Sequence, residues 1–310
     1  MITLRGGDYE HILDLTRHVK GFEIGYEASA LNPLFARMIA ERAYEVCEFS
    51  LANYIMLKDR GADWLTAIPV FPYRAFRHGA LFVRTDSPLT NPSQLSGRTV
   101  AVPDYSMTAA GWARGIFRDR YGLKWSDINW HSGTEQRFPT PAGVKLTRRA
   151  DDLEQAVIDG KIDALLTTGI ADEKRSPADR RLRTLLPDAE EAERAYHQET
   201  GIYPIHHTVV VRSDTLKSHP GLPRALFDAY AQAKANAYQR RLGATLVPWG
   251  LNNWKKQFAA FGGDPLPYGL TDLNIKVVLK LAEYLLDQKL IGAMPDVSSL
   301  FLKDTESWRG

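Results

Sequence analysis

The stretch SGRTVAVPDYSMTAAGWARGIFRDRYG, residues 96–122, decides the fold of this chain. Residues 99–102 are a short apolar run that predicts a buried strand, and the proline that follows predicts a loop. Between residues 109 and 117 apolar side chains recur at helical spacing, which predicts a helix with one apolar face. A strand, a loop and a helix in this order form half of a βαβ unit, and such units build parallel sheets.

The same alternation of strand and helix signals continues on both sides of this stretch. Residues 153–169 predict a helix, a turn and a short buried strand. Further strands are expected at residues 2–4, 22–26, 45–51 and 202–212, and further helices from residue 9 and at 33–44, 52–61, 222–242, 252–261 and 273–290. We therefore predict the α/β class, with largely parallel sheets covered by helices on both faces.

The length of the chain predicts two domains. At 310 residues it exceeds the usual size of a single domain. We expect a discontinuous lobe 1 of residues 1–85 and 206–310, with a lobe 2 of residues 86–205 inserted into it. The apolar strands at 80–84 and 208–212 are the expected crossing segments, because each lies beside a polar motif. Two lobes joined in this way would form a ligand cleft.

Charge and composition argue against several classes of partner. The 39 basic and 37 acidic residues give a net charge of +2, so no long-range field favours nucleic acid or an anionic membrane. The lone Cys47 is expected to be a buried, inert hydrophobe. No window approaches the roughly 18 apolar residues of a membrane span. The first residues lack a signal-peptide core, so a complete sequence would predict a cytoplasmic protein.

A second stretch, TAIPVFPYRAFRHGALFVR at residues 66–84, holds the first candidate site residues. Arg74, Arg77 and His78 lie within five residues, between two apolar segments. Arginine binds carboxylates with a planar fork, and histidine can hold or release a proton near neutral pH. Arg74 and His78 share a face in either a strand or a helix, whereas Arg77 joins them only if the segment is helical or bulged. The alternative is that both arginines pair with acids at the surface.

Two further segments offer sites for an anion or a proton. A helix that starts near Thr108 leaves backbone N–H groups unpaired, which could hold a carboxylate together with the hydroxyls of Ser106 and Thr108. The alternative is that these hydroxyls are ordinary helix caps. In IYPIHH, residues 202–207, strand alternation sends His206 and His207 to opposite sides, so that one of them should face a ligand. Such a pair could also be structural or bind a metal.

An acid and several aromatic residues complete the candidate set. Asp8 follows two glycines at the end of the first expected strand, at the edge where open α/β sheets bind ligands. It could accept a proton from a ring hydroxyl, or it could simply favour a helix N-terminus. The side chains that could wall an aromatic ring, unless they belong to the core, are Tyr105, Tyr203, Trp249 and Tyr268.

Five longer motifs resemble one known family. They are IPVFPYRAFRH at 68–78, VPDYSMTAAGWARG at 102–115, ETGIYPIHHTVVV at 199–211, PW at 248–249 and GGDPLPYG at 262–269, and CEFSLANY at 47–54 extends the likeness. On these motifs the chain resembles the 4,5-dihydroxyphthalate decarboxylases, which convert 4,5-dihydroxyphthalate to protocatechuate and carbon dioxide. The resemblance implies a two-lobe type II periplasmic-binding-protein-like fold with a ligand cleft between the lobes.

The chain departs from the family pattern at two places. His206 stands where an apolar residue is expected, so the family histidine is His207. Ala52 and Asn53 stand where small hydroxyl residues are expected. If these positions line the pocket, a related aromatic acid could replace the substrate of the family.

The implied reaction sets the chemistry that the residues must perform. A proton adds to the ring carbon that bears the leaving carboxylate while a para hydroxyl loses its proton, and aromaticity returns as carbon dioxide departs. No electron-sink cofactor or redox partner is obligatory, so we predict none. His78 and His207 are the expected proton-transfer residues, with their order undecided, and Asp8 is a further candidate. The residues expected to bind the aromatic carboxylate substrate are Arg74, Arg77, Tyr105, Ser106, Thr108, Asn53, Tyr203 and Trp249.

Alternatives of other classes stay open at this point. The fold more often serves non-catalytic solute-binding proteins of ABC-type transporters, which here would carry an aromatic or small organic acid. His78, His206, His207 and Asp8 could converge on a divalent ion, but the chain holds neither HExxH nor CxxC, so we predict no metal. The long C-terminal helices could form a homo-oligomer.

Overall fold

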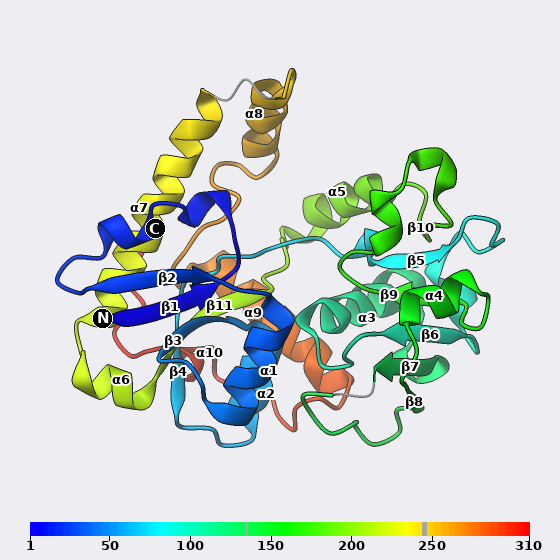
Figure 1. Ribbon diagram of the computed structural model, residues 1–310, viewed down its shortest axis with the longest axis horizontal. Coiled ribbons are helices and arrows are strands. Elements are labelled where there is room, and N and C mark those ends of the chain that lie inside the picture. Colours follow the sequence, from blue (N-terminus) through cyan, green and yellow to red (C-terminus); the bar gives the residue numbers. More distant parts are fainter. Residues whose placement is uncertain (134–135, 244–246) are drawn as a thin grey trace. The chain divides into compact units, whose positions relative to one another are not determined.

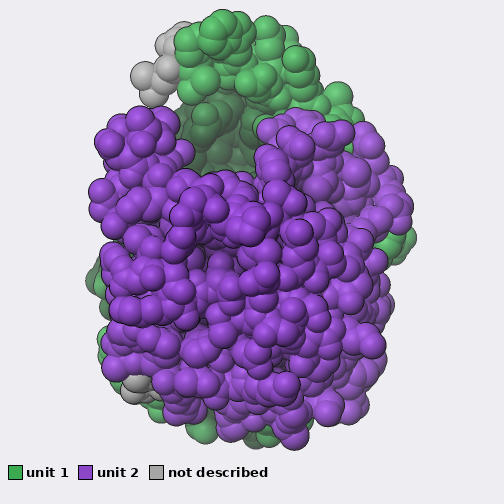
Figure 2. All heavy atoms as spheres, turned by 90° about the vertical axis from the view of Figure 1, so that its right-hand side faces the viewer, with its two compact units in different colours: residues 1–74, 205–278, 295–310 green, residues 75–204, 279–294 purple. Residues whose placement is uncertain are grey.

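The computed structural model describes residues 1–133, 136–243 and 247–310. The chain divides into two compact units, which are coloured separately in Figure 2. Unit 1 comprises Met1–Arg74, Ile205–Val278 and Pro295–Gly310, and unit 2 comprises Ala75–Pro204 and Leu279–Met294. Residues 75–85 and 279–294, which the sequence analysis places in lobe 1, therefore belong to unit 2.

Unit 1 contains a five-stranded mixed sheet with the strand order β2-β1-β3-β11-β4 (Figure 1). Its strands are β1 Ile2–Gly6, β2 Ile24–Ala28, β3 Val46–Ser50, β4 Leu65–Ile68 and β11 His207–Arg212. Strand β1 pairs in parallel with β2 and β3, whereas β11 runs antiparallel to β3 and β4. Every residue of β3 is buried, as expected for a strand at the centre of a covered sheet.

The helices of unit 1 follow or flank these strands. They are α1 Leu31–Glu41, α2 Leu51–Asp59, α6 Ser213–Ser218, α7 Leu222–Leu242, α8 Gly250–Ala260 and α10 Val297–Leu300, with the 3₁₀ helices η1 Glu10–Ile12 and η2 Leu15–His18. Helix α9, Asp272–Asp287, contributes residues to both units. The single helix expected from Tyr9 is thus two short 3₁₀ turns, both of which pack against α7.

Unit 2 contains a six-stranded sheet with the order β10-β5-β9-β6-β7-β8. Its strands are β5 Leu81–Arg84, β6 Thr99–Val102, β7 Asn129–Gly133, β8 Leu146–Arg149, β9 Ala164–Leu166 and β10 Leu182–Thr184. Its longer helices are α3 Thr108–Tyr121, α4 Leu153–Ile158 and α5 Ala189–Thr200, and its 3₁₀ helices are η3 His78–Ala80, η4 Pro92–Leu95, η5 Trp125–Asp127, η6 Ala171–Lys174 and η7 Pro177–Asp179. Part of the core lies where Val157 of α4 meets Phe82 and Leu165 of the sheet.

The α/β class is confirmed, and so is the strand-loop-helix unit at 96–122, which forms β6 and α3. Two expectations are wrong. The sheets are mixed rather than largely parallel, because β11 and β5 each run against their neighbours. These two strands are also not the crossing segments, because the chain changes unit at residues 74–75 and 204–205, before either strand begins. Within the described ranges, no helix is both long and apolar enough to span a bilayer.

Candidate active site

A buried carboxylate lies in the centre of the unit 1 sheet. Glu48 is the third residue of β3 and is only 1 % exposed. Its Oε2 accepts a hydrogen bond from the backbone N–H of Gly7 at 2.7 Å, and its Oε1 accepts one from the hydroxyl of Tyr9 at 2.8 Å. Oε1 also lies 2.5 Å from Nδ1 of His207. These three contacts offset the cost of taking a carboxylate out of water.

The sheet register and a glycine bring these groups together. His207 begins β11 opposite Ser50, the last residue of β3, which sets its side chain beside that of Glu48. On the other side of the carboxylate, a Cβ added to Gly6 would lie 2.7 Å from the hydroxyl of Tyr26 and 2.9 Å from Oε2 of Glu48. Only glycine leaves room for the carboxylate at this position. Gly6 and Gly7 therefore both shape the site around Glu48. Of residues 6–8, only Asp8 is predicted from the sequence alone to belong to it.

The surroundings of His207 leave one ring nitrogen for chemistry. A carboxylate can only accept, so Nδ1 of His207 carries the proton that it donates to Glu48, and Nε2 is the atom free to exchange a proton. The imidazole stacks on Tyr73, with ring centroids 5.0 Å apart, and meets the edge of Phe35 at 5.1 Å. A histidine that is oriented by a carboxylate and packed between rings is the usual arrangement of a general acid or base.

The ring stack continues beyond His207. Tyr73 stacks on Tyr9 with centroids 5.8 Å apart, and Tyr9 stacks on His11 at 5.2 Å. Nε2 of His11 donates to the carbonyl oxygen of Pro72 at 2.9 Å. Burial lowers the pKa of His11, although this hydrogen bond opposes the shift. The rings of His207, Tyr73, Tyr9 and His11 thus form one stacked column, in which His207 and Tyr9 both contact Glu48.

Arg74 lies in the same unit as this pair. It is buried, and its Nη2 donates to Oδ1 of Asn274 at 2.6 Å and to the carbonyl oxygen of Pro267 at 3.0 Å. Its backbone forms a bridge with Ile205, two residues before His207. The structure therefore brings together, within unit 1, one arginine predicted to bind a carboxylate and one histidine predicted to transfer a proton.

A second buried cation of unit 1 is absent from the predicted set. Lys234 of α7 donates from Nζ to Oδ2 of Asp264 at 2.5 Å and to the carbonyl oxygen of Leu266 at 2.8 Å. Its Nζ lies 4.3 Å from the ring centroid of Tyr268. Burial lowers the pKa of Lys234, and Asp264 opposes this shift. The GGDPLPYG motif thus supplies an ion-pair partner and an aromatic face to a lysine on the preceding long helix.

Simple signals could have pointed to both missed residues. Glu48 is a charged residue inside the apolar run VCEFSL, where an unpaired acid would be costly. Lys234 falls at helical spacing on the buried stripe of α7 that includes Leu226 and Tyr230. Glu48 lies in a strand that is buried throughout, and Lys234 lies on the buried face of its helix.

His78 and Arg77 belong to unit 2, so the motif at 66–84 is divided between the two units. The ring of His78 is fully buried and meets the ring of Tyr196 at a centroid distance of 5.3 Å. Neither ring nitrogen has a hydrogen-bond partner among the residues that the structure describes. Burial, with the charge of Arg120, lowers the pKa of His78 to about 4. At neutral pH this imidazole is uncharged, so it has no extra proton to donate.

Helix α3 starts at Thr108, as predicted, but its N-cap is not one of the expected hydroxyl residues. The N-cap residue is Met107, so neither Ser106 nor Thr108 occupies the cap. The hydroxyl of Ser106 donates instead to Oδ1 of Asp104 at 2.5 Å, and the same oxygen accepts the backbone N–H of Ser106 at 2.7 Å. The cap prediction is wrong because the carboxylate two residues earlier holds the serine. Binding of an anion by this helix start stays a prediction.

Tyr105 belongs to the core of unit 2. Its ring centroid lies 3.9 Å from the guanidinium carbon of Arg114 and 5.5 Å from the ring centroid of Trp130. Arg114 is buried and donates to the carbonyl oxygen of Tyr105 at 2.8 Å and to Oε1 of Gln288 at 2.7 Å. Burial lowers the pKa of Arg114. The ring is therefore covered on one face by a guanidinium of the same unit.

The remaining predicted residues are scattered over the two units. Asp8 is exposed, and the carboxylate that contacts His207 is Glu48 instead. Asn53 is buried in the first turn of α2, whereas Trp249 is 71 % exposed just before α8. Tyr203 lies in unit 2, and Tyr268 is buried in unit 1 beneath Lys234. Their roles in binding stay predictions.

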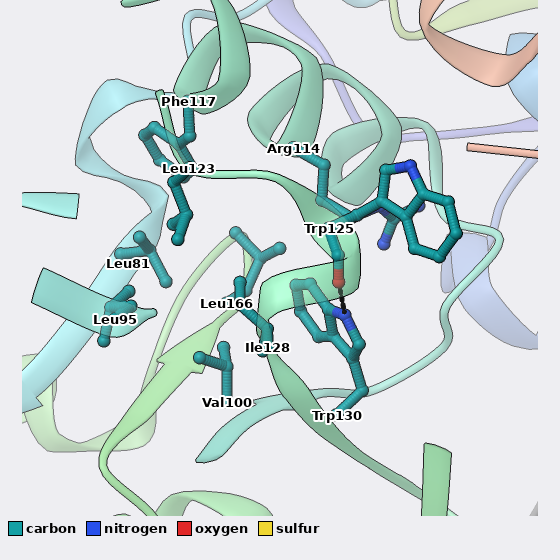
Figure 3. Close-up of a pocket in the computed structure, with 10 residues that line it drawn as sticks. All are labelled: Leu81, Leu95, Val100, Arg114, Phe117, Leu123, Trp125, Ile128, Trp130 and Leu166. Carbon is teal, nitrogen blue, oxygen red and sulfur yellow. Dashed lines mark hydrogen bonds between the residues drawn. The ribbon is translucent and has the colours of Figure 1, made fainter. Parts of the chain in front are cut away.

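One cavity in unit 2 is too small to hold an aromatic acid. Its volume is about 10 Å³, which is room for roughly one water molecule. Figure 3 shows its walls, which include Leu123, Ile128 and Leu166, with the indole N–H of Trp130 donating to the carbonyl oxygen of Trp125. The cavity is a packing gap in the core of the unit. Elsewhere, among the described residues, no three His, Cys, Asp or Glu side chains come together as a possible metal site.

The fold places the chain in the class of periplasmic-binding-protein-like folds. It aligns with the periplasmic aliphatic sulphonate binding protein SsuA from Escherichia coli with a TM-score of 0.61, covering 98 % of this chain and 92 % of that one. The two sequences are 13 % identical, so this likeness concerns the fold alone. The predicted fold class is confirmed.

The family follows from the sequences of two curated proteins. A 4,5-dihydroxyphthalate decarboxylase from Comamonas testosteroni is 30 % identical over 257 residues, which cover 77 % of this chain and 76 % of the relative. A protein of the same name from Pseudomonas putida is 31 % identical over 143 residues, covering 43 % of this chain and 55 % of the relative. The chain belongs to the 4,5-dihydroxyphthalate decarboxylase family, and the predicted class of enzyme is confirmed. No family model matches the chain.

Proposed function

We propose that this chain decarboxylates a hydroxylated aromatic dicarboxylic acid without a cofactor, and that its substrate is 4,5-dihydroxyphthalate, which yields protocatechuate and carbon dioxide. The names of both curated relatives support this substrate. The observation that carries the proposal is the buried pair of Glu48 and His207, joined by a 2.5 Å contact. It supplies the proton-transfer group that the reaction needs, oriented by a carboxylate.

In the proposed reaction His207 is the acid. Its Nε2 gives a proton to the ring carbon that bears the leaving carboxylate, while the para hydroxyl loses its proton to solvent water. The carbon–carbon bond then breaks, its electron pair restores the aromatic ring, and carbon dioxide departs. The phenolate and the neutral imidazole each regain a proton from the solvent. Glu48 stabilises the imidazolium before the transfer, because its carboxylate accepts the Nδ1–H.

The other candidate histidine is unsuited to this step. Burial and Arg120 lower the pKa of His78 to about 4, so near pH 7 it could accept a proton but has none to give as an acid. We therefore assign the acid role to His207. Arg74 is proposed to orient a substrate carboxylate, because its guanidinium is fixed by Asn274 and Pro267.

Product analysis tests the proposal. The purified chain is incubated with 4,5-dihydroxyphthalate, and carbon dioxide and protocatechuate are measured together. We expect both products to appear in equal amounts, without added metal or cofactor. If the ligand raised the melting temperature and was never consumed, the chain would bind and not catalyse.

That second outcome corresponds to the other candidate function, a solute-binding protein. The fold is compatible with it, since SsuA, which shares the fold, is named as a binding protein. The family relatives, which are named as enzymes, favour catalysis instead. The cytoplasmic location and a homo-oligomer stay predictions, to be checked by cell fractionation and by size-exclusion chromatography with light scattering.

A further inference from the structure

Two tyrosines beside the glycine pair of unit 1 donate their hydroxyls to different acceptors. The hydroxyl of Tyr9 donates to Oε1 of Glu48 at 2.8 Å, the same oxygen that lies 2.5 Å from Nδ1 of His207. The hydroxyl of Tyr26 donates to the backbone carbonyl oxygen of Gly7 at 2.6 Å. Both side chains are half-buried. Only one of these two neighbouring phenols therefore contacts the carboxylate that holds the imidazole.

We propose that Tyr9 is a positioning residue that controls, through the shared oxygen of Glu48, how strongly His207 holds its proton. Each hydrogen bond to a carboxylate draws negative charge toward the donor. When Tyr9 donates to Oε1, less of that charge is available to stabilise the imidazolium. The phenol of Tyr9 thus weakens the hold of the His207 imidazolium on its proton, so that the proton can pass to a ring carbon. The consequence for catalysis rests on the proposed function, whereas the effect on His207 does not.

Tyr9 is suited to this role because it stays a donor. Burial raises the pKa of its phenol, and the nearby charge of Glu48 raises it further. The ring is also held on both sides, by Tyr73 and by His11. Neither loss of its proton nor rotation of the ring removes the hydrogen bond between pH 5 and 9.

Several ionisable groups besides His207 lie near Glu48, and burial shifts the pKa of each of them away from neutral pH. Glu48 also acts on Tyr26, Cys47, Tyr230 and Tyr268, and burial raises the pKa of each of them. These four groups therefore stay neutral through the same pH range. Rings that touch His207 are those of Tyr73, Phe35 and His206. His11, next in the column, carries a pKa that burial lowers, and Lys234 lowers it further.

NMR titration of the His207 ring in the whole, ligand-free protein is the direct test. We expect Tyr9→Phe to move its midpoint upward by about half a pH unit or more, a change of roughly threefold in the protonation equilibrium. Tyr26→Phe is the matched control, because it removes a neighbouring phenol, on β2, whose hydrogen bond goes to the backbone of Gly7 and not to the carboxylate. It should produce less than half of that shift. The His207 signals are assigned by their loss in His207→Gln.

A second variant covers the case in which Tyr9→Phe does not fold. Incorporation of 3,5-difluorotyrosine at position 9 makes the phenol a stronger donor, so the midpoint should move downward instead. The pH profile of carbon dioxide release should shift in the same direction as the titration in each variant. Unchanged midpoints, equal shifts in the two Phe variants, or shifts of the wrong sign would overturn the proposal. A correct shift in a protein that releases no carbon dioxide would refute the proposed function alone.

Discussion

Two buried histidines, His207 in unit 1 and His78 in unit 2, have opposite surroundings. His207 donates to the carboxylate of Glu48, which stabilises a protonated imidazole. His78 has no hydrogen-bond partner in the part of the chain that the structure describes, and the charge of Arg120 adds to the effect of burial. Each residue lies in one of the motifs that resemble the family. The comparison shows that the partner supplied by another element, rather than the motif, sets the proton chemistry of a histidine.

Removing the carboxylate of Glu48 should have the largest effect on the stability of the protein. Glu48→Ala leaves the imidazole, the phenol of Tyr9 and the N–H of Gly7 without their shared acceptor. We expect a loss of about 3–5 kcal/mol in the free energy of unfolding, as for other broken buried pairs. Urea denaturation measures it. Glu48→Gln, which keeps an acceptor oxygen and the volume, should lose clearly less, and equal losses would contradict the account.

The pH dependence of the free energy of unfolding tests the proposed environment of His78. Its pKa is lowered to about 4 in the folded chain, below the value near 6.5 of an unfolded histidine. As the pH falls from 6.5 towards 4 the unfolded chain binds a proton that the folded chain does not, so stability falls by roughly 3 kcal/mol. Denaturation at pH 7 and pH 4.5 should therefore show a smaller loss for His78→Leu than for the wild type. The same loss in both proteins would refute the assignment.

A smaller effect is expected from filling the space beside the carboxylate. Gly6→Ala would bring a methyl group to 2.9 Å from Oε2 of Glu48. We expect a destabilisation of about 1–3 kcal/mol, as is typical of overpacking. The matched control is Gly25→Ala on β2, whose new methyl group would meet only Met1 at 3.8 Å. If the two variants were equally stable, the close approach at Gly6 would not constrain the site.

The smallest effect is expected at Trp249. The side chain is 71 % exposed, so Trp249→Ala should change the free energy of unfolding by less than about 0.5 kcal/mol. The KM of the same variant tests the sequence-based prediction that this ring helps to bind the substrate. A large loss of stability would contradict the exposed position of this ring.

Local patterns were enough to predict much of the fold. The apolar pattern of the sequence predicts strand β6 and helices α3 and α7. Strand β6 is a short run that is mostly buried, and the two helices bury apolar residues at helical spacing. The segment after Tyr9 could not be predicted in this way, since its buried residues, among them Ile12 and Leu15, fit a helical period although the backbone forms two 3₁₀ turns. The direction of β11 and β5 also depends on pairing with distant strands.

The candidate site was predicted only in part, because its contacts are distant along the chain. The sequence predicts His207 and Arg74 as site residues, and the structure places both in unit 1. The sequence alone does not predict Glu48, which meets His207 across 159 positions of sequence. No local pattern reports that contact. For the same reason the sequence points to Asp8, which follows Gly6 and Gly7. The carboxylate that these glycines accommodate is that of Glu48.

The central claim is that His207 delivers the proton, and one measurement tests it most directly. Carbon dioxide release from 4,5-dihydroxyphthalate is compared between the wild type and His207→Gln, with calorimetry on the same samples to measure binding. We predict that the variant still binds the substrate while its turnover falls by about 10²- to 10⁴-fold. A folded variant that turns over at close to the wild-type rate would contradict the account.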